Sequence, residues 1–217
     1  NLRNLVTGGA GFIGSHLIKE LIKRNEKVIC LDNFETGSLS NIKKFENNDN
    51  FKFIRGNVIN PINVSVDRIW HFACPASPSK YLLNPIQTLR TNFIGSNNIL
   101  NLATKLRAKV LFASSSEIYG EPKEHPQKET YFGNVNPNGH RSCYEEGKRI
   151  SETLFINFNA EYNTDIRIAR IFNTYGSNMM PNDGRVINNF LYQCLNLKPL
   201  TIYGDGNQTR TFCHIDD

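Results

Sequence analysis

A tyrosine and a lysine four positions apart, Tyr144 and Lys148, are the first candidates for chemistry in this sequence. Both fall in a segment, 142–163, whose apolar residues recur at helical spacing, so the two side chains share one face of a predicted helix. An ammonium group beside a phenol stabilises the phenolate, which lowers the pKa of the tyrosine towards a range useful for proton transfer. Taken alone, this spacing more often marks a surface tyrosine beside a solvated lysine. The interpretation of Tyr144 and Lys148 as a catalytic pair therefore depends on the motifs around them.

Three hydroxyls and a carboxylate follow a predicted strand over 110–114. The segment reads Ser114-Ser115-Ser116-Glu117. It stands at the carboxyl end of that strand, where ligands bind in open α/β sheets. Such groups can hydrogen-bond a substrate hydroxyl and hold a water or a leaving group. Serines at a strand end also form turns, so this segment too needs its context.

A glycine-rich turn follows the first predicted strand, 2–7. Gly8, Gly11 and Gly14 are spaced three apart and lead into a predicted helix over 15–24. Glycine there lets the chain turn tightly and lets backbone N–H groups approach a pyrophosphate, whose charge the helix N-terminus stabilises. A glycine triplet alone also arises for packing. The strand before it and the helix after it favour a dinucleotide site.

Asp32 directly follows the second predicted strand, 28–31, and lies 18 residues beyond Gly14. A carboxylate at about this distance binds the adenosine ribose hydroxyls in dinucleotide-binding folds. Its charge would repel a 2′-phosphate, and neither Asn33 nor Phe34 could neutralise one, so the sequence predicts NAD rather than NADP as cofactor. The simpler alternative is an aspartate that caps a turn.

The elements that must position these residues alternate between strand and helix. Further buried strands are predicted at 51–55, 69–72 and 166–171, and a long helical pattern covers 85–106. Alternation of this kind predicts a parallel, doubly wound, Rossmann-like α/β sheet covered on both faces. The segment 121–141 is rich in proline and glycine and is predicted to be a long loop of functional type.

Length and composition limit the other possibilities. At 217 residues the chain is one domain or one plus part of a second, and we expect an NAD-binding domain over 1–172 and a partial substrate-binding region over 173–217, with the protein continuing past Asp217. The net charge of +5 is spread along the chain, which argues against nucleic acid binding. No apolar run is long enough for a membrane helix, and no leader pattern opens the chain.

The cysteines and histidines suggest no metal site. There are five cysteines and no Cys-x-x-Cys pair, and the five histidines lack metal-ligand spacing. His71, at the end of a strand, is expected to be a core residue. The cysteine usage favours a reducing compartment, hence the cytoplasm, with the Golgi lumen as the alternative if an anchor precedes this chain.

Together these motifs resemble the extended short-chain dehydrogenases/reductases that act on nucleotide sugars. Beyond the glycine turn, the resemblance rests on segments 32–34, 74–78, 84–85, 91–92, 116–120, 134–137, 143–149, 170–176, 182–186 and 209–210. The Pro-Ala-Ser-Pro stretch at 75–78 and the Asn-Asp-Gly-Arg-Val stretch at 182–186 are the specific ones. One departure is Asn57, where the family usually has aspartate before Val58.

The resemblance implies an activity and a set of roles. The activity is NAD-dependent decarboxylation of UDP-glucuronate to UDP-xylose through a 4-keto intermediate, with the cofactor regenerated. The catalytic residues it implies are Ser115, Glu117, Tyr144 and Lys148. The cofactor-binding residues are Tyr144 and Lys148 again and Gly8, Gly11, Phe12, Ile13, Gly14, Asp32, Asn33, Thr36, Gly37, Asn57, Val58, Phe72, Cys74, Thr91, Thr174 and Arg185. The residues for the UDP-sugar are Tyr81, Arg90, Asn98, Asn173 and Arg210, with Arg185 and Arg210 as candidates for diphosphate oxygens.

One position separates neighbouring activities. Related 4,6-dehydratases carry Asp-Glu where this chain has Ser116-Glu117, and without that aspartate the departing hydroxyl has no proton donor. Epimerases typically have another residue in place of Glu117. A 4,6-dehydratase or epimerase of the same superfamily stays open as an alternative, as does a non-catalytic NAD-binding or interaction protein.

Association is predicted as a homodimer. The helices over 85–106 and 142–163 would form the interface, because Leu154 and Phe155 extend the apolar stripe further than one core face requires, and because the family commonly forms dimers.

Overall fold

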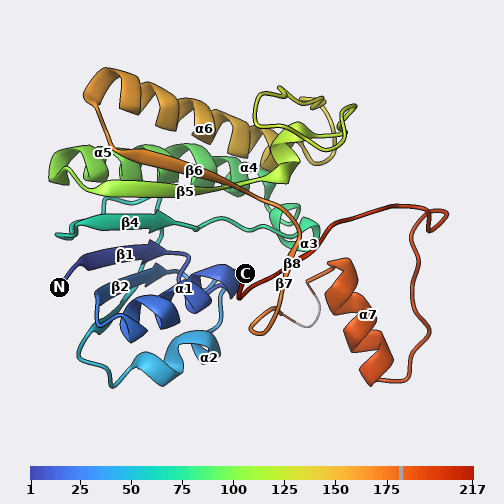
Figure 1. Ribbon diagram of the computed structural model, residues 1–217, viewed down its shortest axis with the longest axis horizontal. Coiled ribbons are helices and arrows are strands. Elements are labelled where there is room, and N and C mark those ends of the chain that lie inside the picture. The colour runs from blue at the N-terminus through green and yellow to red at the C-terminus, as the bar shows by residue number, and fades with distance from the viewer. Residues whose placement is uncertain (181–182) are drawn as a thin grey trace.

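Six parallel strands form the main sheet of the computed structural model, which describes residues 1–180 and 183–217 (Figure 1). In chain order they are β1 (Arg3–Thr7), β2 (Lys27–Asp32), β3 (Phe51–Arg55), β4 (Arg68–His71), β5 (Lys109–Ser115) and β6 (Ile166–Ile171). Their order across the sheet is β3-β2-β1-β4-β5-β6, and each neighbouring pair is parallel. This is the doubly wound arrangement, with its reversal of direction between β1 and β4. The predicted fold class is confirmed.

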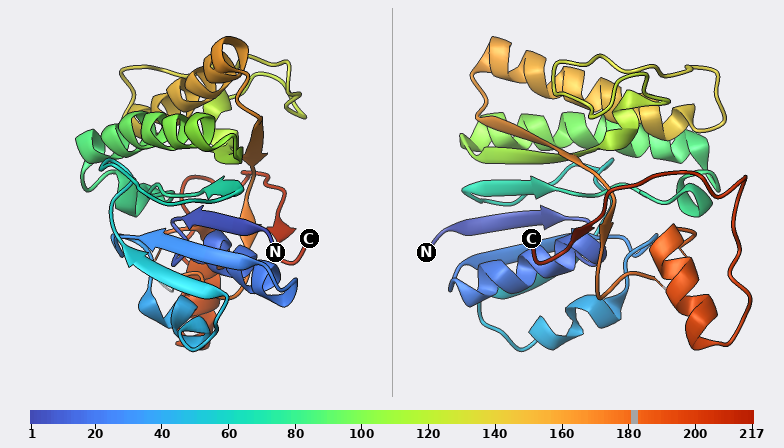
Figure 2. Two further views of the ribbon diagram at one scale, coloured as in Figure 1. Left: turned by 90° about the vertical axis from the view of Figure 1, so that its left-hand side faces the viewer. Right: turned by 45° about the vertical axis from the view of Figure 1, so that its right-hand side comes forward.

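Helices pack on both faces of this sheet (Figure 2). Successive strand residues point to opposite faces of the sheet. On one face, Val6 of β1 packs in a core cluster with Ile18 of α1 (Phe12–Lys23). On the other face, Leu5 of β1 packs in a second cluster with Ile99 of α5 (Ser96–Leu106). The cluster of Val6 and Ile18 also contains Phe45, the last residue of η1 (Lys43–Phe45), which directly follows α2 (Leu39–Ile42). No described helix combines the length and the apolar character needed to cross a membrane.

The helical pattern predicted over 85–106 is interrupted. It consists of α4 (Pro85–Arg90), a π-helical turn, η2 (Thr91–Gly95), and α5. Within the turn, the Asn92 amide donates to the Cys74 thiol at 3.2 Å and to the Thr88 carbonyl at 3.0 Å. π-Helical turns occur often at functional sites, and this one ties α4 to the segment that leaves β4.

The long segment 121–141 contains no helix and is held by arginines from neighbouring elements. Arg149 of α6 (Ser142–Tyr162) donates to the carbonyls of Ile118 and Phe132, both at 2.8 Å. Arg170 of β6 donates to the Glu129 carbonyl at 2.8 Å. Two further short helices are α3 (Pro78–Tyr81) and η3 (Ser116–Tyr119), and η3 directly precedes this segment. The predicted loop is therefore fixed against the sheet edge.

The last part of the chain lies beyond the carboxyl ends of the sheet strands (Figure 1). It contains α7 (Val186–Leu195) and a separate two-stranded sheet of β7 (Thr174–Tyr175) and β8 (Cys213–His214). This separate sheet is consistent with a boundary after Phe172, which stays a prediction. Asn182, part of the predicted specific stretch 182–186, lies outside the described residues.

Two residues cited for dimer formation belong to the core instead. Phe155 is completely buried, and its ring stacks on Phe112 with centroids 4.9 Å apart. Leu154 is half-buried and packs against the same cluster. The interpretation of these two residues as interface residues was wrong, because α6 turns this face towards β5 and β6.

Truncation of the Phe155 side chain tests this packing. Phe155→Ala should lower the free energy of unfolding by about 3–5 kcal/mol, since it removes buried contacts and leaves a cavity. Glu161→Ala, at an exposed position of the same helix, should change it by less than about 0.5 kcal/mol. Urea denaturation measures both, and equal effects would contradict the placement of Phe155.

Candidate functional site

A pocket of about 490 Å³ opens at the carboxyl ends of β1, β4, β5 and β6. Because strand order reverses between β1 and β4, the turns that follow these strands diverge and leave a crevice there. The structure brings most of the predicted residues to this pocket: Gly8, Gly11, Phe12, Ile13, Gly14, Asp32, Asn33, Thr36, Asn57, Val58, Phe72, Cys74, Tyr81, Thr91, Ser115, Glu117, Tyr144, Lys148, Asn173, Thr174, Arg185 and Arg210 line it.

The glycine turn leaves room that a side chain would fill. Gly8 has a φ of +69°, and a Cβ there would lie 2.8 Å from the backbone nitrogen of Ala73, which follows β4. A Cβ on Gly14 would collide with the Gly8 carbonyl. The turn can therefore lie close to both β4 and the start of α1, whose free N–H groups and dipole favour an anion. These residues fit a dinucleotide pyrophosphate.

Asp32 lies at the end of β2 and is held by the turns on either side of it. Its two carboxylate oxygens accept the backbone N–H groups of Ala10 at 2.9 Å and Phe34 at 2.8 Å. Burial raises the pKa of Asp32, and these N–H groups offset part of that rise. The side chain is thus fixed at the rim of the pocket, where a ribose of the bound dinucleotide would meet it.

A cation near Asp32 was missed by the sequence reasoning. Arg55 on β3 pairs in register with Asp32, and its guanidinium carbon lies 5.9 Å from the ring centroid of Phe34. Only the register of β2 with β3 places Arg55 beside Asp32. Arg55 is exposed and does not line the pocket formed by the described residues.

Tyr144 and Lys148 are both buried side by side in α6. Lys148 Nζ donates to the Ala113 carbonyl at 2.8 Å and lies 5.7 Å from the Tyr144 ring centroid. Burial lowers the pKa of Lys148, and it also keeps His71 neutral by lowering its pKa to about 3. This burial excludes the alternative of a surface tyrosine beside a solvated lysine.

The predicted lowering of the tyrosine pKa is wrong for the protein by itself. Burial raises the pKa of Tyr144, the nearby Cys74 thiol adds to the rise, and the Ser115 hydroxyl acts in the opposite direction. The physical reason is that the loss of water around the buried phenol outweighs the opposing effect of the Ser115 hydroxyl, while the ammonium of Lys148 donates to a backbone carbonyl of β5.

Glu117 forms an ion pair that the sequence did not indicate. Its carboxylate contacts the guanidinium of Arg141, whose Nε donates to the Tyr81 hydroxyl at 2.9 Å. The Tyr81 ring in turn stacks on Tyr144, with centroids 4.6 Å apart and planes 6° from parallel. One signal was available: Arg141 directly precedes a helix, and a cation is unfavourable at that end of the helix dipole unless something compensates it.

Three predicted residues are not brought to the pocket. Asn98 lies on α5, where its amide donates to the Val58 carbonyl at 2.9 Å, and it does not line this pocket, so its assignment to the substrate stays a prediction. Arg90 is exposed at the end of α4 and does not line the pocket formed by the described residues. Gly37 does not line the pocket formed by the described residues either, and a Cβ there would lie 3.0 Å from a carboxylate oxygen of Asp32.

Comparison with known proteins adds to this geometry. Residues 4–217 match the NAD dependent epimerase/dehydratase family. The chain belongs to this family. The match includes the glycine turn, Asp32 and the Tyr144–Lys148 pair. It confirms the resemblance seen in the sequence and, at the level of the family, the NAD cofactor.

Named relatives and solved structures of the family are similar over nearly the whole chain. The chain is 54% identical to UDP-glucuronic acid decarboxylase 4 of Arabidopsis thaliana over 216 residues, and 49% identical to UDP-glucuronic acid decarboxylase 1 of Danio rerio over 215 residues, covering 100% and 99% of this chain. It spans about half the length of these relatives, 49% and 51%. A structure of UDP-glucuronic acid 4-epimerase from Bacillus cereus, in complex with UDP-glucuronic acid and NAD, matches with a TM-score of 0.87 and 31% identity, over 99% of this chain and 70% of that one.

The charge of Asp32 is predicted to select the cofactor. Asp32→Asn should raise the affinity for NADP relative to NAD by about tenfold or more, because two like charges 4 Å apart repel by about 4 kcal/mol at an effective dielectric of 20. Calorimetric titration with both cofactors measures the ratio. Glu46→Gln, an exposed carboxylate away from the pocket, is the charge-matched control. Equal affinities of the unaltered protein for NAD and NADP would remove this role from Asp32.

Proposed function

We propose that the protein to which this chain belongs is an NAD-dependent UDP-glucuronate decarboxylase. The observation that carries the proposal is that Tyr144, Lys148 and Glu117 line the same pocket as the glycine turn. The relatives named above support it, and so does Ser116, which stands where a dehydratase carries its acid. Since the chain spans about half of those relatives, the activity is proposed for the whole protein.

Oxidation at C4 of the sugar comes first in this proposal. NAD, when bound, supplies the two-electron acceptor for the C4 hydrogen. Tyr144 takes the proton of the 4-hydroxyl as its phenolate, a form that the cationic nicotinamide ring of bound NAD and the charge of Lys148 would favour over the raised pKa of the site by itself, and the Ser115 hydroxyl stabilises that form. Lys148 lies close enough to assist by its charge. The burial that raises the pKa of Tyr144 also excludes water from the proton transfer.

The C4 ketone then makes loss of carbon dioxide possible. The C5–C6 bond breaks, carbon dioxide leaves, and the electron pair passes to the ketone oxygen, which the Tyr144 hydroxyl can stabilise by donating a hydrogen bond. A proton from solvent, placed by Glu117, adds to C5 and restores the ketone. Reduction at C4 and return of the proton from Tyr144 complete UDP-xylose without net use of cofactor.

The reaction is tested directly by its products. The complete protein should release carbon dioxide and UDP-xylose from UDP-glucuronate with no net change in NAD. Tyr144→Phe should lower kcat by about 10²-fold to 10⁴-fold, because it removes the proton acceptor but keeps the ring. Glu117→Gln should lower kcat more than it weakens NAD binding. The measurements are chromatography of the nucleotide sugars and NAD titration of each variant.

Other products would point to the alternatives. A 4-keto-6-deoxy sugar from UDP-glucose or dTDP-glucose would favour a dehydratase, and a C4-inverted uronate would favour an epimerase. NAD binding without turnover of any nucleotide sugar would favour the non-catalytic alternative.

We also propose that the protein is a homodimer through the outer faces of α4, η2 and α6. The support comes from apolar side chains that these helices expose: Ile86 by 70%, Leu89 by 40%, Phe93 by 45%, Ile150 by 43% and Ile156 by 56%. Burying such a patch on a second copy is favourable.

Sedimentation measures this association. The complete protein should be a dimer at micromolar concentration, and Ile156→Glu should dissociate it, because a charge would then be buried in the interface. A monomer for the unaltered protein would contradict the proposal.

The proposed location is the cytoplasm, with the Golgi lumen as the alternative. The support is that all five cysteines are free, as is usual in a reducing compartment.

A further inference from the structure

Glu152 is a carboxylate that the proposed reaction does not use. It lies on α6, and its side chain is only 13% exposed. Ser114 of β5 donates to it at 2.5 Å, and Arg170 of β6 donates from Nε at 3.1 Å and from Nη2 at 2.8 Å. Hydrogen bonds from a cation and a hydroxyl stabilise the charge of a carboxylate. A fixed negative charge therefore lies between α6 and the sheet.

This carboxylate is one helical turn from Lys148. Residues four apart on a helix share a face, with Cβ atoms about 5–6 Å apart. The two side chains also reach consecutive residues of β5, because Lys148 donates to the Ala113 carbonyl at 2.8 Å and Glu152 accepts from Ser114. Lys148 is only 4% exposed, so water screens its interaction with the carboxylate weakly.

The other titratable groups near Lys148 supply no such charge near neutral pH. Burial lowers the pKa of Lys148, and Cys74 and Glu152 act against this lowering. Burial raises the pKa of the Cys74 thiol, which follows β4, and lowers that of His71 on β4 to about 3, so both groups are neutral. Tyr144, whose ring centroid lies 5.7 Å from the ammonium, becomes an anion only in the reaction. Within the part of the chain that the structure describes, Glu152 is therefore the anion that balances Lys148.

We propose that Glu152 is a positioning residue for the reaction and acts through Lys148. Its charge keeps the ammonium of Lys148 protonated in a site closed to water, and this ammonium in turn favours the phenolate of Tyr144 that accepts the substrate proton. The inference rests on the proposed function for the step that Glu152 serves. It gives a role to a residue that none of the sequence motifs includes.

Titration of Lys148 itself tests the effect of this charge. In the complete, NAD-loaded protein with ¹³C at lysine Cε, NMR follows each lysine with pH, and Lys148→Arg identifies the signal. Glu152→Gln should lower the midpoint of Lys148 by about one pH unit or more, because it removes the negative charge and keeps the shape of the side chain. The alkaline limb of kcat should move to lower pH by the same amount, while the affinity for NAD stays within about twofold.

Loss of the partner cation separates charge from packing. Arg170→Met breaks the same ion pair but leaves the charge of Glu152, so it should raise the midpoint of Lys148. The rise should be smaller, about half a pH unit, because Arg170 reaches the carboxylate from β6, the strand beyond the one that Lys148 contacts. A loosened helix would instead admit water to Lys148 in both variants and move both midpoints in the same direction.

A double variant covers the case in which Arg170→Met does not fold. Loss of one partner leaves the other charge uncompensated in a largely closed site, which is strongly destabilising. Glu152→Gln with Arg170→Met leaves neither charge. It should still lower the midpoint of Lys148, by less than Glu152→Gln alone.

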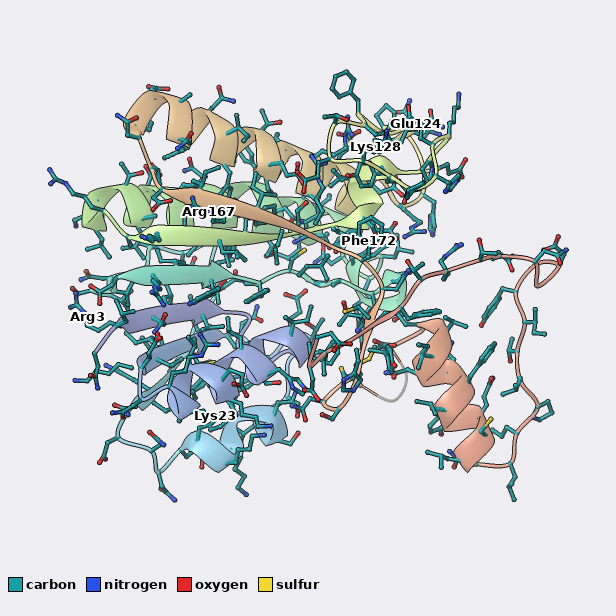
Figure 3. The ribbon with its side chains drawn as sticks, in the orientation of Figure 1. Arg3, Lys23, Glu124, Lys128, Arg167 and Phe172 are labelled. Atoms are coloured by element: carbon teal, nitrogen blue, oxygen red, sulfur yellow. The ribbon has the colours of Figure 1, made fainter. Side chains whose placement is uncertain are left out.

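Matched controls lie on the same two elements. Arg167→Met removes an arginine of β6 whose side chain is 69% exposed. Figure 3 shows Arg167 towards the opposite end of β6 from Phe172, which lines the pocket. Glu161→Gln removes a carboxylate at an exposed position of α6. Both variants should leave the midpoint of Lys148 unchanged.

The outcomes distinguish this inference from the proposed function. A midpoint of Lys148 that stays the same or rises in Glu152→Gln would overturn the inference, and so would a lower midpoint in Arg170→Met. Absence of carbon dioxide release by the unaltered protein would refute the proposed function, and the midpoints would still decide whether Glu152 controls the charge of Lys148.

Discussion

The position of β1 between β2 and β4 is the constraint on which the site depends. β1 is paired in parallel with both neighbours, Thr7 opposite Leu31 on one side and opposite His71 on the other. Parallel pairing brings the carboxyl ends of all three strands to one edge, so the glycine turn, Asp32 and the segment after β4 must meet there. The close approach of Gly8 to Ala73 follows directly from this pairing, and a side chain at position 8 would prevent it.

A second set of interactions places the catalytic end of the pocket. Glu152 of α6 accepts hydrogen bonds from Ser114 at the end of β5 and from Arg170 of β6, and Arg170 also donates to the Tyr119 hydroxyl. Hydrogen bonds to charged groups contribute about 1.5–3 kcal/mol each. This network fixes α6 relative to β5, and so it sets where Tyr144 and Lys148 lie relative to the residues that follow Ser114.

The sequence predicted the elements better than their interruptions and contacts. The strands over 51–55 and 166–171 have the predicted bounds, and the bounds of the others differ by one residue, because each strand is a short run rich in apolar residues. The π-helical turn was not predicted, since its residues follow the same helical spacing as their neighbours. Phe155 was misread because an apolar stripe does not tell a wide core face from an interface.

Site residues were predictable where a motif fixes backbone geometry, as in the glycine turn and Asp32, and not where a side chain reaches across elements. The contacts of Arg141 are with Glu117 and Tyr81, which are 24 and 60 residues away in the sequence, so its place before a helix marks it as unusual but does not reveal these partners. Asn98 differs for the converse reason, because its amide donates to the carbonyls of Val58 and Asn60, and its side chain does not line the pocket.

The central claim is that Tyr144 and its neighbours oxidise C4 so that the bond between C5 and the carboxylate can break. The most direct measurement is the position of deuterium in UDP-xylose formed from UDP-glucuronate in D₂O, read by proton NMR. The mechanism predicts one solvent deuterium at C5 and none on the carbon at C4, because the hydrogen removed from C4 is carried by the cofactor and returned. Solvent deuterium on C4, or its absence from C5, would contradict the account.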